Sequence, residues 1–150
     1  MASQDYEIRG YGIQFDSKCG TDTTVDRIKQ LLELAPEVKA DVEAWLKDID
    51  ISLDEVMVDD YADFDQDYNN GIPALIAKVI NAVEGIFVEA ASDDDGVLYL
   101  YLCCCMPWGY NEKERNLTAE ELEDIFRKYW NILYPEKVTT IDAVSIHQFG

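Results

Sequence analysis

The stretch from Asp54 to Gly71 holds the densest set of side chains that could do chemistry. It contains seven carboxylates and neither Lys nor Arg. The carboxylates are Asp54, Glu55, Asp59, Asp60, Asp63, Asp65 and Asp67, and the aromatic residues Tyr61, Phe64 and Tyr68 stand among them. Because like charges this close repel one another, we expect the stretch to meet something cationic. The candidates are a divalent metal ion, a basic protein surface, or water and counterions.

Calcium binding is one candidate chemistry. Asp65, Asp67 and Asn69 stand at positions 1, 3 and 5 of a segment similar to an EF-hand loop. Asn70 replaces the glycine of position 6, and Ile76 stands at position 12, where a bidentate Glu is needed. The segment therefore lacks its strongest ligand. A metal-binding regulatory module stays an alternative, with a weak Ca²⁺ or Mg²⁺ site formed by Asp63, Asp65, Asp67 and Asn69.

Three consecutive cysteines, Cys103, Cys104 and Cys105, are a second candidate. Consecutive strand residues point to opposite faces, whereas paired zinc ligands need two or more residues between them. A nucleophilic Cys needs a neighbouring base, and the single histidine, His147, is three residues from the end of the chain. The sequence contains no glycine-rich phosphate loop and no nucleophile elbow. We therefore expect a protein that is not an enzyme and that uses no cofactor.

The net charge of the chain is −19, from 31 acidic and 12 basic residues. Duplex DNA carries roughly one charge per 1.7 Å of axis, and a compact chain of this length has a radius of gyration of about 15 Å. The protein thus carries about as much negative charge per unit length as a duplex. Such a surface repels nucleic acid and anionic membranes and attracts proteins that bind nucleic acid. We expect this protein to bind a basic nucleic-acid-binding partner. The alternative is that it is a generic acidic, soluble protein.

The predicted partner-binding surface combines acids with aromatic residues. Carboxylates steer a basic partner and bind its arginines, while aromatic side chains supply anchors that lose water on binding. The alternative is a solvated loop whose aromatic residues pack back onto the core, and for each aromatic residue taken singly that alternative is favoured. The predicted surface comprises Asp59, Asp60, Tyr61, Asp63, Phe64, Asp65, Asp67, Tyr68, Asp93, Asp94 and Asp95.

Hydrophobic periodicity predicts one α+β domain over residues 1–150, with a mostly antiparallel sheet of about four strands packed by about four helices. Strands are expected at 6–15, in a hairpin over 86–105, and at about 138–146. Helices are expected from a cap at Asp22 or Thr23, from Pro36 to Ile49, over 72–84, and from a capping box at Thr118 to a stop at Pro135.

The strand patterns also predict which faces are buried. Glycines at 10 and 12 indicate a bend or a close backbone approach in the first strand. In the second strand of the hairpin, Leu98, Leu100 and Leu102 are expected to face the core, and Tyr99 and Tyr101 a partly covered face.

Several observations indicate a cytoplasmic protein. No stretch approaches the roughly 18 apolar residues of a membrane-spanning helix. The N-terminus has neither the basic region nor the apolar core of a signal peptide. Four cysteines, three of them consecutive, do not form the pattern of an extracellular disulfide framework.

Three features together resemble small acidic proteins carried by phages and mobile elements of Gram-positive bacteria. They are the early Gly10-Tyr11-Gly12-Ile13 strand, the acidic middle of the chain, and the charged run over 111–129. Some proteins of this kind inhibit host defence nucleases, including CRISPR effectors, by occupying a nucleic-acid groove. The resemblance implies a non-enzymatic inhibitor that mimics nucleic acid and acts in the cytoplasm of the host cell.

Overall fold

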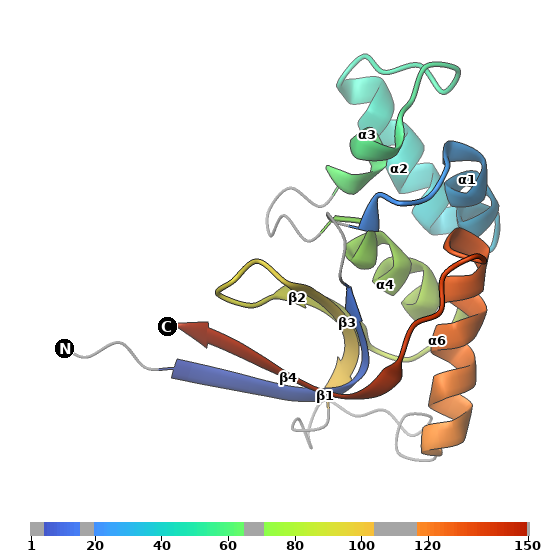
Figure 1. Ribbon diagram of the computed structural model, residues 1–150. Helices are drawn as coiled ribbons and strands as arrows, with labels where there is room; N and C mark the ends of the chain where they lie inside the picture. The colour runs from blue at the N-terminus through green and yellow to red at the C-terminus, as the bar shows by residue number, and fades with distance from the viewer. Residues whose placement is uncertain (1–4, 16–19, 65–70, 104–116, 150) are drawn as a thin grey trace.

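The computed structural model describes residues 5–15, 20–64, 71–103 and 117–149. Within these ranges the chain forms one four-stranded antiparallel sheet and five helices, which confirms the predicted α+β class (Figure 1). The elements are β1 (Asp5–Phe15), α1 (Val25–Glu33), α2 (Pro36–Asp48), α3 (Val58–Ala62), α4 (Gly71–Glu84), β2 (Val88–Ser92), β3 (Leu98–Cys103), α6 (Ala119–Leu133) and β4 (Ile141–Phe149).

The sheet has the strand order β2-β3-β1-β4, so the first strand of the chain lies inside it. Strand β1 pairs with β4 through residues 5–13 and with β3 through residues 10–15. The predicted hairpin is confirmed as the antiparallel pair β2–β3, although Cys104 and Cys105 lie outside the described residues. At the hairpin turn, the backbone N–H of Asp94 donates to the carbonyl of His147 in β4 at 3.2 Å. This bond joins the β2–β3 end of the sheet to the opposite edge strand (Figure 1).

The helices gather on one side of the sheet, with α4 at the centre (Figure 1). Nine of the fourteen residues of α4 are buried, as its nearly continuous apolar sequence predicts. Gly85 ends this helix with a positive φ of 69°, and its N–H donates to the carbonyl of Asn81. Leu98, Leu100 and Leu102 face this main core, as expected.

The opposite face of the sheet carries a second, smaller apolar cluster. Tyr99, Tyr101 and Ile146 form it, and Ile8 and Val144 pack against it. Tyr99 and Tyr101 are 7% and 3% exposed, so this face is more deeply covered than the expected partly covered face. The hydroxyls remain satisfied, because Tyr99 donates to Asp93 and Tyr101 to Glu89, both at 3.2 Å.

Two expected helix starts are confirmed and one is wrong. Pro36 opens α2, and the hydroxyl of Thr118 accepts the N–H of Glu121 at the start of α6. The cap of α1 is Thr24, whose hydroxyl accepts the N–H of Arg27, and not Asp22 or Thr23. Thr23 instead donates its hydroxyl to the carbonyl of Leu133, which ties the start of α1 to the end of α6.

The acidic stretch differs from a plain connecting loop, because it contains the short helix α3. Ile49, expected on the apolar face of the second helix, is 42% exposed and follows the last residue of α2.

No helix in the described part of the chain is long and apolar enough to cross a membrane.

Candidate functional site

The predicted surface begins with three aspartates on and after α3. Asp59 and Asp63 are exposed. Asp60 is half-buried, and its carboxylate accepts the backbone N–H of Met57 at 2.8 Å, which caps the helix. The exposed carboxylates of Asp59 and Asp63 can therefore pair with a partner protein, whereas the carboxylate of Asp60 caps the helix. Asp65, Asp67 and Tyr68 lie outside the described residues.

The two described aromatic residues of this stretch pack inward. Tyr61 is 1% exposed, and burial, then the charges of Glu43 and Asp60, raise the pKa of its hydroxyl. Phe64 is half-buried and meets Trp45 of α2 edge-on, with ring centroids 5.5 Å apart. These side chains fasten α3 to the body of the protein, so neither is an exposed anchor in this conformation.

Asp93, Asp94 and Asp95 form the β2–β3 turn but differ in role. One carboxylate oxygen of Asp93 accepts the N–H groups of Asp95 and Val97, each at 2.9 Å, and the other accepts the hydroxyl of Tyr99. Asp93 thus builds the turn. Asp94 and Asp95 are exposed and add negative charge to the surface.

The described residues of the predicted surface fall into two groups. Helix α3 lies beside α2, at the end of the molecule formed by residues 36–63, which we call the helical end. The β2–β3 turn lies beside the end of the sheet that holds the C-terminus (Figure 1).

The metal alternative gains no ligand set from the described residues. Within the described ranges, no three His, Cys, Asp or Glu side chains are grouped so that they could hold a metal ion. Asp63 is the one member of the alternative site that the structure places. Asp65, Asp67 and Asn69 lie outside the described residues.

A feature that the sequence reading missed lies directly after α2. The helix ends in a Schellman motif. The N–H of Ile51 donates to the backbone carbonyl of Leu46 at 2.9 Å, and the N–H of Asp50 donates to the backbone carbonyl of Lys47 at 3.1 Å. Asp50 has a φ of 60°, the left-handed conformation that usually selects glycine. Among the described residues it is the only non-glycine residue with a positive φ.

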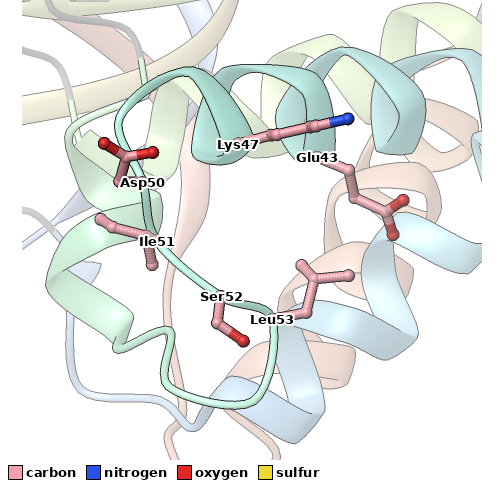
Figure 2. A pocket seen from close by; sticks show the side chains of 6 residues that line it. All are labelled: Glu43, Lys47, Asp50, Ile51, Ser52 and Leu53. Carbon is pink, nitrogen blue, oxygen red and sulfur yellow. The ribbon is translucent and has the colours of Figure 1, made fainter.

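The chain beyond this motif leaves a hollow of about 470 Å³ between the C-terminal half of α2 and the returning segment. Figure 2 shows the side chains around it, with Leu53 directed toward α2. A second hollow of about 160 Å³ shares Glu43 and Leu53 with the first and reaches Tyr61. The lining residues of the first are Glu43, Lys47, Asp50, Ile51, Ser52 and Leu53.

Exposed apolar side chains gather on the same segment. Ile49, Leu53 and Met57 are 42%, 41% and 64% exposed. The segment is nevertheless pinned, because Ile51 packs against the core, Val56 is buried, and Lys29 donates its ammonium to the carbonyl of Leu53 at 3.1 Å. We call residues 49–57 the apolar connector.

The surroundings of the apolar connector are strongly acidic. From Pro36 to Asp63 the chain has ten acids and two bases. One base, Lys39, forms an ion pair with Glu33 at 2.5 Å, so part of its charge is already compensated. The acids are Glu37, Asp41, Glu43, Asp48, Asp50, Asp54, Glu55, Asp59, Asp60 and Asp63, and the bases are Lys39 and Lys47.

Compared with protein-family models, with curated proteins and with solved structures, the chain has no significant match in any of the three.

Proposed function

We propose that this protein is a non-enzymatic acidic binding protein that occupies a basic surface of a nucleic-acid-binding protein. The observation that carries the proposal is the helical end of the molecule, residues 36–63, where ten acids stand against two bases. The charge is fixed on a packed scaffold, since Val42, Leu46 and Tyr61 of this region are buried.

Electrostatics favours this class of partner over others. A chain with net charge −19 repels nucleic acid and anionic lipid, and it accelerates its encounter with a cationic surface. A groove that normally binds phosphates offers arginines and lysines, and carboxylates such as those of Asp59 and Asp63 can pair with them. The acidic protein then competes directly with the nucleic acid.

The finer form of the proposal is an inhibitor of a host defence protein, such as a CRISPR nuclease, encoded by a phage or mobile element and acting in the cytoplasm. Its support is the resemblance to small acidic phage proteins together with the charge of the helical end. Mimicry of nucleic acid is the corresponding mechanism.

A competition assay tests the proposal. The tagged 150-residue chain is used to capture partners from a lysate of a defence-bearing Gram-positive host, and each captured protein is then purified. We expect a captured nucleic-acid-binding protein to lose its DNA or RNA as the acidic protein is added. We also expect the complex to weaken steeply between about 50 and 300 mM salt.

Charge reversal should use acids that have no structural role. Replacement of Asp54, Glu55, Asp59 and Asp63 by Lys is expected to abolish competition while the far-UV circular dichroism spectrum is preserved. Asp60 and Asp93 are left intact because their carboxylates hold backbone N–H groups. A charge-reversed protein that still displaces nucleic acid, or binding that ignores salt, would contradict the proposal.

A further inference from the structure

We infer that the hollow beside the apolar connector receives an apolar side chain from a basic amphipathic helix of the partner. This inference rests on the proposed function and names the element that the helical end recognises. It uses the hollow between α2 and residues 50–53, which charge mimicry alone does not require.

The apolar part of the proposed binding site consists of side chains that the fold leaves outside its core. Leu53 stands between the two hollows, and Ile49 and Met57 are exposed on either side of it in sequence. A cavity of about 150 Å³ accommodates a benzene ring. The larger hollow, at about 470 Å³, is open to solvent on one side and is wide enough to admit a Leu or Phe side chain.

The site is already formed in the free protein. The Schellman motif fixes Asp50 and Ile51, Val56 anchors the far end of the apolar connector, and Lys29 holds the carbonyl of Leu53. Binding to such a segment requires little ordering of the backbone, which is a main cost of association.

The backbone of the apolar connector disfavours recognition by strand addition. Six of its nine N–H groups are already bonded within the protein, at Ile49, Asp50, Ile51, Asp54, Glu55 and Met57. A partner strand would find at most three of the nine N–H groups to pair with. A helix satisfies its own backbone and presents only side chains, so a helix is the matching occupant.

The charges around the hollow indicate which polar residues the partner helix carries. Asp48, Asp50, Asp54 and Glu55 are exposed around the apolar side chains, and Lys47 is the single base among the described residues that line the hollow. The complementary element carries apolar residues on one face and Lys or Arg beside them. A second copy of this chain is a poor occupant, because it would bring the same acidic surface.

Asp50 links the charge to the hollow. Glycine would adopt its left-handed conformation more easily, yet the chain places a carboxylate there, at the rim of the hollow (Figure 2). Backbone strain of this kind is often retained where the side chain has a role in binding.

Fluorescence anisotropy with three labelled synthetic peptides tests the inference. The first is an 18-residue helix with Leu at positions i, i+4, i+7 and i+11 and Lys or Arg on its other face. The second has the same composition with the Leu residues dispersed, and the third has the same charge without Leu. At about 150 mM salt we expect the first peptide to bind at least tenfold more tightly than the other two.

Two substitutions locate the binding site, and a third serves as the control. Leu53→Ser is expected to abolish the tenfold preference, whereas Val138→Ser, at a residue that is 98% exposed, should leave it unchanged. Met57→Ser, at a residue that is 64% exposed, should also weaken binding of the first peptide. This variant replaces Leu53→Ser in the test if Leu53→Ser lowers the stability of the fold. Amide NMR shifts induced by the first peptide should centre on residues 47–57.

The other outcomes separate the inference from the proposed function. Equal binding of all three peptides, unaffected by Leu53→Ser and Met57→Ser, would overturn the inference that the hollow binds an apolar side chain. It would leave the electrostatic proposal intact. No binding of any peptide at 20 mM salt would overturn both. A concentration-dependent dimer that Leu53→Ser dissociates would identify a second copy as the occupant and overturn the inference.

Discussion

Gly12 lies so close to β3 that a Cβ atom on it would stand 2.0 Å from the carbonyl oxygen of Leu100. The same atom would stand 2.7 Å from the Cα atom of Tyr101, so backbone on two residues fills the space. At Gly10, the neighbouring glycine of β1, a Cβ atom would meet the ring of Tyr101 at 2.6 Å. The close approach predicted from the Gly-Tyr-Gly pattern is therefore confirmed, and it lets Tyr101 cover the strand.

Gly12→Ala should accordingly destabilise the fold. Because β3 backbone cannot move aside like a flexible side chain, we expect a loss of about 3 kcal/mol or more in the free energy of unfolding. Urea denaturation followed by circular dichroism measures this loss. Ala40→Gly, at an exposed site inside α2, is the comparison substitution and should cost about 1 kcal/mol. A Gly12→Ala protein as stable as the wild type would contradict the geometry.

Local patterns predicted the elements that depend on nearby residues. The Thr118 cap, the Pro36 start, the buried helix before Gly85 and the alternation of Leu98 to Leu102 all follow from short-range spacing. The burial of Tyr99 and Tyr101 depends instead on Ile146, which arrives from the last strand. Sequence spacing carries no signal for that long-range contact.

The candidate site was less predictable than the fold. The charge of the acidic stretch was evident, but the inward packing of Tyr61 and Phe64 depends on where α2 and α4 lie. The hollow was missed because Ile49 continues the apolar period of α2 and yet lies beyond its end. A signal did exist, since an apolar residue followed by Asp50 and Ile51 is compatible with a helix-ending motif.

The side-chain amide of Asn81 forms a second key contact, because it bonds both backbone groups of Val88. Its nitrogen donates to the carbonyl at 2.9 Å, and its oxygen accepts the N–H at 2.6 Å. Asn81→Asp should cost about 1–3 kcal/mol, since a carboxylate would face the Val88 carbonyl without a proton to donate. Thermal unfolding measures the change. Ala82→Gln, on an exposed neighbouring site, should stay within about 0.5 kcal/mol.

Buried tyrosines should make the fold sensitive to alkali. Burial raises the pKa of Tyr129, and the Glu84 carboxylate that accepts its hydroxyl raises it further. Burial, and then the charge of Asp22, raise the pKa of Tyr134, whose hydroxyl donates to the Gly20 carbonyl. A raised folded-state pKa means that the unfolded chain loses these protons first.

The stability from these tyrosines is therefore complete below pH about 10, the ordinary tyrosine pKa, and falls as the pH rises toward the folded-state values. Each contributes a slope of up to about 1.4 kcal/mol per pH unit in that window. Urea titrations from pH 8 to 11 should show the fall, and Tyr129→Phe should reduce its slope. Absorbance at 295 nm that shows all nine tyrosines ionising near pH 10 in the folded protein would refute this prediction.

Substitutions at Asp50 should separate stability from binding. Asp50→Gly relieves the left-handed strain and is expected to stabilise the protein by about 0.5–1 kcal/mol, while Asp50→Asn should be nearly neutral. Both remove the carboxylate from the rim of the hollow, so both should weaken the amphipathic peptide severalfold. Asp124→Asn, an exposed site on α6, is the charge-matched control. Stability and affinity that rise together in Asp50→Gly would show that the carboxylate has no role in binding.

Salt should act on folding and on binding in opposite directions. The folded chain concentrates a net charge of −19, so screening relieves self-repulsion more in the folded state than in the expanded unfolded chain. Raising KCl from 20 to 300 mM should increase the free energy of unfolding by about 1 kcal/mol, or about 3 °C in Tm for a chain of this size. The same change should weaken any complex with a cationic partner. Loss of binding at high salt therefore reports the interface and not unfolding, and a Tm that falls with KCl would contradict the charge-repulsion argument.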